Sequence, residues 1–170
     1  LEFRRVLFRS HGHVVLVGYG EKGKIILDEL LQRHLSVVVV DDHHAVVEEL
    51  REKKVNSIYG DATDPAILIQ AHIHEAAILV LAIDNEILCR KIVETAKILR
   101  PTIETVMPAE NEEDAKALKA DGVAQAFVPD ELLAQAIVQF TMSRFGKESE
   151  DQKIREEEAE EQKAIERGAL

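Results

Sequence analysis

VVLVGYGEKG, residues 14–23, is the stretch of this sequence that decides the fold. An apolar run leads into a G-x-G-x-x-G pattern, and a helical pattern and a second apolar run, Val37 to Val40, follow it. In a βαβ unit, Gly18 permits the tight turn, Gly20 lets the backbone approach a phosphate, and Gly23 lets helix and strand pack closely. The N-terminus of the helix favours phosphate through its unpaired N–H groups and its dipole. The stretch therefore predicts a Rossmann-type unit that holds a phosphate-bearing nucleotide.

An acid stands at the end of the second apolar run. Asp41 occupies the position from which a carboxylate accepts hydrogen bonds from ribose hydroxyls. Because this carboxylate would repel a 2′-phosphate, NADP is disfavoured relative to NAD, AMP, ADP or ATP. The sequence therefore predicts NAD(H) or an adenine nucleotide as the ligand.

Strand and helix patterns alternate along the chain as far as residue 145. Both faces of the strand patterns are apolar, as the strands of parallel sheets require. We expect strands at 14–17, 37–40, 55–59, 77–83, 103–107 and 126–128, and helices at 22–33, 45–53, 65–71, 86–99, 112–120 and 132–145. The predicted fold is α/β, a Rossmann-like doubly wound parallel six-stranded sheet in the order 3-2-1-4-5-6, with a charged C-terminal tail.

The chain divides into three predicted segments. Residues 1–10, LEFRRVLFRS, are typical of translated adapter sequence, so we exclude them from the fold and expect the natural protein to continue upstream of His11. Residues 11–146 form the predicted nucleotide-binding domain. In residues 147–170 charged side chains predominate, and the apolar stripe is too thin to bury, which leaves a solvated helix or disorder as alternatives.

Composition excludes several classes of protein. The net charge of −11, with no basic patch to offset it, argues against a nucleic-acid partner. The single cysteine, Cys89, cannot form an internal disulfide, so a reducing cytosol is the expected compartment. We interpret Cys89 as a core residue on the apolar face of a helix rather than as a redox sensor. No apolar run approaches the roughly 18 residues of a membrane-spanning helix.

The candidate ligand-binding residues follow four predicted strands, whose carboxyl ends meet at one edge of the sheet. They are Gly18, Tyr19, Gly20, Lys22, Gly23, Asp41, Asp42, Asp61, Ala62, Ile83 and Asp84. Asp61 and Asp84 have an alternative role, because each precedes a predicted helix whose N-terminus it could cap.

Catalytic and metal-ligating patterns are missing from the sequence. There is no Tyr-x-x-x-Lys pair and no Ser/His/Asp grouping, and the predicted fold leaves no second region to hold a substrate. His72 and His74 point to different faces, and no cysteine or acid cluster completes a metal site with them. We therefore predict no catalytic or metal-binding residues, and a nucleotide that is sensed rather than consumed.

The sequence resembles the TrkA-N domain, also called the RCK N-terminal domain, over residues 13–145. The residues that carry the resemblance are Val15 to Gly20, Asp41, the Gly60-Asp61-Ala62-Thr63 step and Ala82-Ile83-Asp84. Within the family, the C-terminal domains of Kef-type monovalent cation:proton antiporters are the most similar. The resemblance implies that Gly18, Gly20 and Gly23 hold phosphate, Asp41 the ribose, and Asp61 and Asp84 the adenine side of the pocket.

The same resemblance implies a regulatory domain, in the cytoplasm, of an inner-membrane transporter encoded upstream of this segment. It also implies a homodimer, for which two helices offer apolar side chains in excess of what packing on a sheet needs. These side chains are Ile137, Val138, Phe140, Met142 and Phe145, together with Ile87, Leu88, Ile92, Val93 and Ile98. Simple burial of both helices is the alternative interpretation.

Three functions remain as alternatives. The first is a domain that gates a potassium or other monovalent-cation transporter. The second is a free-standing TrkA-like subunit of potassium uptake, which transmembrane helices encoded directly upstream would exclude. The third is a fragment of an NAD-dependent oxidoreductase, which hydride transfer to a small carbonyl compound would establish.

Overall fold

A computed structural model describes residues 12–168, and within them six strands form one parallel sheet. The strands are β1 (Val14–Val17), β2 (Val37–Asp41), β3 (Asn56–Tyr59), β4 (Ile78–Leu81), β5 (Glu104–Pro108) and β6 (Gln125–Phe127). Their order is β3-β2-β1-β4-β5-β6, and every pair of neighbours is parallel. The predicted doubly wound sheet and its strand order are confirmed.

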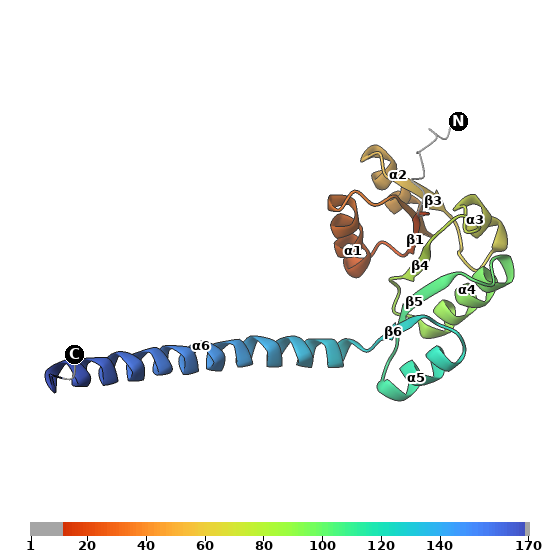
Figure 1. Ribbon diagram of the computed structural model, residues 1–170. Helices are drawn as coiled ribbons and strands as arrows, with labels where there is room; N and C mark the ends of the chain where they lie inside the picture. The colour runs from red at the N-terminus through yellow and green to blue at the C-terminus, as the bar shows by residue number, and fades with distance from the viewer. Residues whose placement is uncertain (1–11, 169–170) are drawn as a thin grey trace. The chain divides into compact units, whose positions relative to one another are not determined.

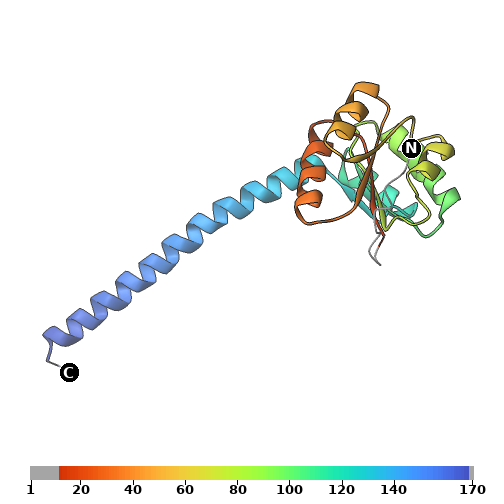
Figure 2. The same ribbon diagram turned by 90° about the horizontal axis from the view of Figure 1, so that it is seen from above.

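Helices cover both faces of this sheet (Figures 1 and 2). They are α1 (Glu21–Gln32), α2 (His44–Glu52), α3 (Pro65–Gln70), α4 (Glu86–Leu99) and α5 (Glu112–Ala120). Successive side chains of a strand point to opposite faces. In β1, Val14 and Leu16 therefore pack with α1 and α2, whereas Val15 and Val17 pack with α3, α4 and α5.

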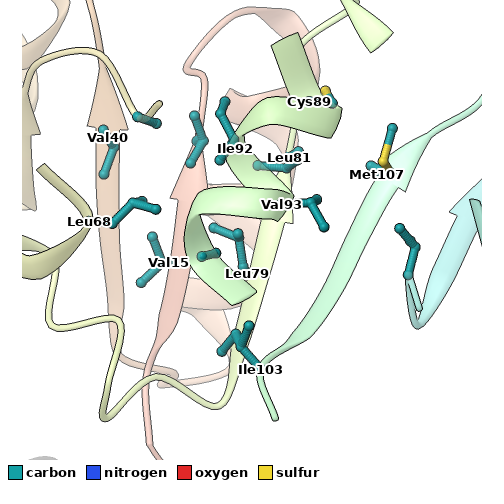
Figure 3. Packing of buried hydrophobic residues seen from close by; sticks show 14 of the residues in the cluster. Val15, Val40, Leu68, Leu79, Leu81, Cys89, Ile92, Val93, Ile103 and Met107 are labelled. Carbon is teal, nitrogen blue, oxygen red and sulfur yellow. The ribbon is translucent and has the colours of Figure 1, made fainter. Parts of the chain in front are cut away.

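The larger core lies between the sheet and α4 (Figure 3). Cys89 and Ile92 of α4 are buried there beside Leu79 of β4, which confirms the prediction that Cys89 is a core residue. Burial raises the pKa of the Cys89 thiol to about 11, so the thiol stays protonated near neutral pH and is a poor nucleophile. Leu88 and Ile92 of the same helix reach the carboxyl edge of the sheet. The core thus extends to the carboxyl edge of the sheet as an apolar floor.

The last helix, α6 (Pro129–Glu166), is one uninterrupted helix of 38 residues (Figure 2). Helix was one of the two alternatives for residues 147–170, and the structure shows it as far as Glu166. The helix formers Glu, Lys, Arg and Gln dominate this segment, and a single interior glycine costs only about 1 kcal/mol.

Packing contacts divide the chain between Val128 and Pro129, whereas the sequence placed the domain boundary at residue 146. The sequence left two interpretations of the apolar side chains in residues 132–145, a homodimer interface or burial against the sheet. In the structure, Ile137, Val138 and Phe140 are each more than half exposed. None of the helices in residues 12–168 combines the length and hydropathy needed to cross a bilayer.

Candidate functional site

The three glycines of the loop between β1 and α1 have different surroundings. Gly18 has φ +95°, a conformation that favours glycine, and its N–H donates to the Val40 carbonyl over 2.9 Å. A Cβ on Gly23 would lie 2.1 Å from the carbonyl oxygen of Gly18, so α1 can pack against the loop only with glycine there. A Cβ on Gly20 would meet no atom within 4 Å. Gly18 and Gly23 therefore serve the fold, whereas Gly20 leaves open space beside the loop.

The N-terminus of α1 has no side-chain cap. Gly20 is its N-cap residue, whereas α3, α4 and α5 are capped by the side chains of Asp64, Asn85 and Asn111. The first N–H groups of a helix have no partner within the helix and need an outside acceptor. An anionic group such as a phosphate meets that need at this position.

Asp41 lies at the end of β2, where its side chain is 8% exposed. Its Oδ2 atom accepts a hydrogen bond of 2.8 Å from the Tyr19 N–H, and its Oδ1 atom accepts one of 2.9 Å from the His43 N–H. The ring atom Nδ1 of His43 also lies 2.9 Å from Asp41 Oδ1 and 2.8 Å from Asp42 Oδ1. The Asp41 carboxylate therefore ties the loops after β1 and β2 together, a role that its motif position did not reveal.

The hydrogen bond to Asp41, together with the nearby charge of Asp42, raises the pKa of His43 above its ordinary value of 6.5. Protonated His43 therefore stabilises the folded domain below about pH 6.5, and this contribution is lost as the pH rises through the raised pKa. We expect an NMR titration of the His43 imidazole to show a midpoint above that of the unfolded chain, and Asp41→Asn to lower it. A midpoint at or below 6.5 would contradict the hydrogen-bonded arrangement.

Asp61 follows β3 in a turn of its own. Its Oδ1 atom accepts hydrogen bonds from the N–H and the hydroxyl of Thr63, over 2.8 and 2.7 Å. These two bonds hold the pKa of the Asp61 carboxyl below its usual value. The alternative that Asp61 caps the next helix is wrong, because Asp64 accepts the capping bond from Ala66.

Asp84 follows β4 and forms an ion pair with Lys22 of α1. The alternative that Asp84 caps α4 is also wrong, because Asn85 accepts the capping bond from Leu88. The strand order places β4 on one side of β1 and β3 on the other, so Asp84 and Asp61 lie on opposite sides of the glycine loop. The resemblance assigns both carboxylates to the adenine side of the pocket, and that assignment stays a prediction.

A cavity of about 410 Å³ opens at this edge of the sheet. Every candidate ligand-binding residue lines it except Lys22 and Gly23. The structure thus brings the candidates together, and their contact with a ligand stays a prediction. Further residues that line the cavity were missed: His43, Gly60, Val46, Leu88 and Ile92. The sequence held a signal for two of them, because Gly60 belongs to the Gly60-Asp61-Ala62-Thr63 step and His43 follows two acids at a helix start. Val46, Leu88 and Ile92 gave none, because the helical pattern of these apolar residues is that of packed positions.

Asp41, Asp42 and His43 also place one ligand-type atom each within 4.8 Å of one another. The sequence prediction of no metal site did not anticipate this grouping. Both oxygens of Asp41 already accept hydrogen bonds from the protein, and Asp42 and His43 are mostly exposed. We interpret the group as a hydrogen-bonded network that shapes one wall of the cavity.

Three proteins illustrate the sequence similarity of this chain to channels and antiporters. YbaL, a putative cation/proton antiporter of Escherichia coli, is 29% identical over 75% of this chain and 23% of its own length. Potassium channel protein 1 of Methanocaldococcus jannaschii is 32% identical over 71% of this chain and 37% of its own. The glutathione-regulated potassium-efflux protein KefC of Cronobacter sakazakii is 30% identical over 66% and 18%. The chain thus spans well under half the length of each relative.

Solved structures show the same fold. The TrkA-N domain of YbaL superposes with a TM-score of 0.71 at 29% identity, covering 76% of this chain and 96% of that domain. The C-terminal domain of a Kef protein from Shewanella denitrificans, in its AMP-bound form, has a TM-score of 0.63 at 24% identity over 76% and 80%. The GsuK channel bound to NAD has a TM-score of 0.61 at 20% identity over 71% and 22%. These last two likenesses show the fold alone.

The family model of the TrkA-N domain matches residues 14–129, from β1 to the start of α6. The match includes the whole sheet and every residue that lines the cavity. The family match agrees with the resemblance found in the glycine loop and in the Gly60-Asp61-Ala62-Thr63 step. The order of the strands and the similarity to the YbaL domain agree with it as well. This chain belongs to the TrkA-N domain family.

Proposed function

We propose that this chain is a nucleotide-sensing domain, which binds NAD(H) or an adenine nucleotide and regulates a potassium or other monovalent-cation transporter of the Kef type. One observation carries the proposal. The cavity at the carboxyl edge of the sheet joins an open space at Gly20 to a buried carboxylate at Asp41. The AMP-bound Kef domain and the NAD-bound GsuK channel, which share the fold, support the class of ligand.

We propose a position for the ligand that is consistent with the order of the strands. Ribose hydroxyls donate to Asp41 at the end of β2, and the adenine extends from there toward Asp61 and Ala62 after β3. The phosphate lies in the space beside Gly20, against the uncapped N-terminus of α1. Anything beyond the phosphate continues toward Asp84 after β4. A mononucleotide occupies only the first part of this path, whereas a dinucleotide occupies all of it.

Sensing rather than catalysis is the role that we propose for this site. Its relatives by sequence are channels and antiporters, and the thiol beneath the cavity is held protonated. A bound nucleotide shifts the conformation of an attached transporter to the extent that it binds one state better than the other. We propose accordingly that the chain acts in the cytoplasm, joined to a membrane portion upstream.

We also propose that the domain forms a homodimer. Support comes from α6, whose first half exposes large apolar side chains: Ile137, Val138, Phe140, Met142 and Phe145. Exposed apolar surface of this extent is typical of protein interfaces. Sedimentation velocity measurements test this proposal, and a monomer at every concentration up to the millimolar range would contradict it.

Calorimetric titration of the domain with adenosine, AMP, ATP, NAD, NADH and NADP tests the proposed function. We expect AMP or NAD(H) to bind, and NADP to bind at least tenfold more weakly than NAD, because Asp41 repels the 2′-phosphate. The NAD–NADP pair is its own control, since the two differ by one phosphate. Absence of binding by all six compounds, or equal affinities for NAD and NADP, would refute the assignment.

A further inference from the structure

The cavity carries an excess of negative charge. Four carboxylates line it, those of Asp41, Asp42, Asp61 and Asp84, and no lysine or arginine is among its lining residues. A phosphate that enters this cavity meets repulsion from several of them. A phosphate-bearing ligand therefore needs a positive group from just outside the lining residues.

Lys22 is placed to supply that group. It lies in the first turn of α1, between Gly20 and Gly23, and its side chain is about half exposed. Among the lysines and arginines in the described part of the chain, Lys22 is the one that forms an ion pair with a carboxylate lining the cavity, that of Asp84. The pair joins the start of α1 to the end of β4. It therefore lies at the side of the cavity that is next to the proposed phosphate position beside Gly20.

The Lys22–Asp84 pair is easily exchanged. Asp84 is 88% exposed, and an ion pair between exposed side chains contributes little to stability because water screens both charges. A phosphate oxygen bound at the helix N-terminus is a more favourable partner, since charge-assisted hydrogen bonds to phosphate are strong and directional. Lys22 can therefore leave Asp84 and bind a phosphate instead with little loss in the stability of the domain.

We propose that Lys22 sets the specificity of this site for the phosphate charge of its ligand, being held by Asp84 in the free domain and transferred to the phosphate on binding. The proposal rests on the proposed function. One lysine adds one positive charge and the N-terminus of α1 adds about half a charge more, whereas Glu21 in the same turn adds one negative charge. A phosphomonoester carries about 1.5 to 2 negative charges at pH 7, so one phosphate already uses the positive charge available at this site. AMP, with its single phosphate, is therefore favoured over ATP, whose further charges face the carboxylates unbalanced.

Titrations of a Lys22→Gln variant with adenosine, AMP and ATP test this inference. We expect the affinity for AMP to fall about tenfold, as loss of one charge-assisted hydrogen bond predicts, and the affinity for adenosine to change less than about twofold. Lys119→Gln removes the same charge from an exposed site in the last turn of α5 and is the matched control, with all affinities unchanged. An AMP-to-adenosine affinity ratio that Lys22→Gln leaves unchanged would overturn the proposal.

Asp84→Asn tests whether the ion pair with Asp84 holds Lys22 in the free domain. It frees Lys22, so we expect a gain of two- to fivefold in AMP affinity, which is smaller when Lys22→Gln is also present. If Asp84 acts only by direct repulsion, the gain is the same in both backgrounds, and the exchange step is wrong. Failure of the proposed function gives a different result: adenosine and AMP then do not bind to the unaltered domain, or bind regardless of Asp41→Asn. Circular dichroism confirms the fold of each variant.

Discussion

Gly23→Ala is expected to destabilise the domain by about 3 kcal/mol or more, which places it among the most damaging single substitutions. The added Cβ would lie 2.1 Å from the carbonyl oxygen and 2.9 Å from the carbonyl carbon of Gly18, both of them backbone atoms that cannot rotate away. Nor can α1 move outward freely, because Leu27 anchors it in the core with 1% of its surface exposed. Urea denaturation followed by circular dichroism measures the loss.

Gly20→Ala is the matched control for this prediction. Gly20 has φ −79°, which alanine adopts without strain, and its added Cβ meets no atom within 4 Å. We therefore expect a loss of less than about 1 kcal/mol, the usual cost of alanine at an N-cap position. Nucleotide affinity, by contrast, is expected to fall at least tenfold, because the methyl group occupies the space through which a phosphate approaches the backbone. Equal destabilisation by both substitutions would contradict the division of roles among the glycines.

The sequence predicted the sheet well because its strands have little freedom. A run such as residues 14–17, apolar on both faces, fits only a strand covered by helices on each side. Once the runs alternate with helical patterns, short right-handed connections leave few strand orders. Asp41 was identifiable for the same reason, since the end of β2 is a defined place relative to the glycine loop.

The unpredicted features depend on contacts between distant residues or on a shift of one to three positions along the chain. Lys22 and Asp84 are 62 positions apart, and no local pattern announces that they form an ion pair. The caps of α3 and α4 fall on Asp64 and Asn85 rather than on Asp61 and Asp84, because a helix start is uncertain by a few residues from sequence. Periodicity alone likewise cannot tell an exposed apolar helix such as the first half of α6 from a buried one.

Asp41→Asn is expected to lower the affinity for adenosine, AMP and NAD by ten- to a hundredfold. The asparagine oxygen still accepts the hydrogen bond from the Tyr19 N–H, which holds the loop after β1. The amide NH₂ then replaces the oxygen that accepts bonds from His43, so two donors face each other and no charged acceptor remains for a ribose hydroxyl. Calorimetric titration measures the loss.

The same substitution separates the two roles of the Asp41 carboxylate. Loss of its hydrogen bonds to His43 costs the fold about 1 to 3 kcal/mol, which a domain with the usual 5 to 15 kcal/mol tolerates, so the folded variant remains open to titration. Asp28→Asn removes the same charge from an exposed side chain of α1 that does not line the cavity, and we expect that control to change nucleotide affinity less than about threefold. Because Asp41 is also the group that repels a 2′-phosphate, the preference for NAD over NADP should narrow in Asp41→Asn alone. A variant that loses stability but keeps both its affinities and its preference would show that the carboxylate serves only to tie the loops together.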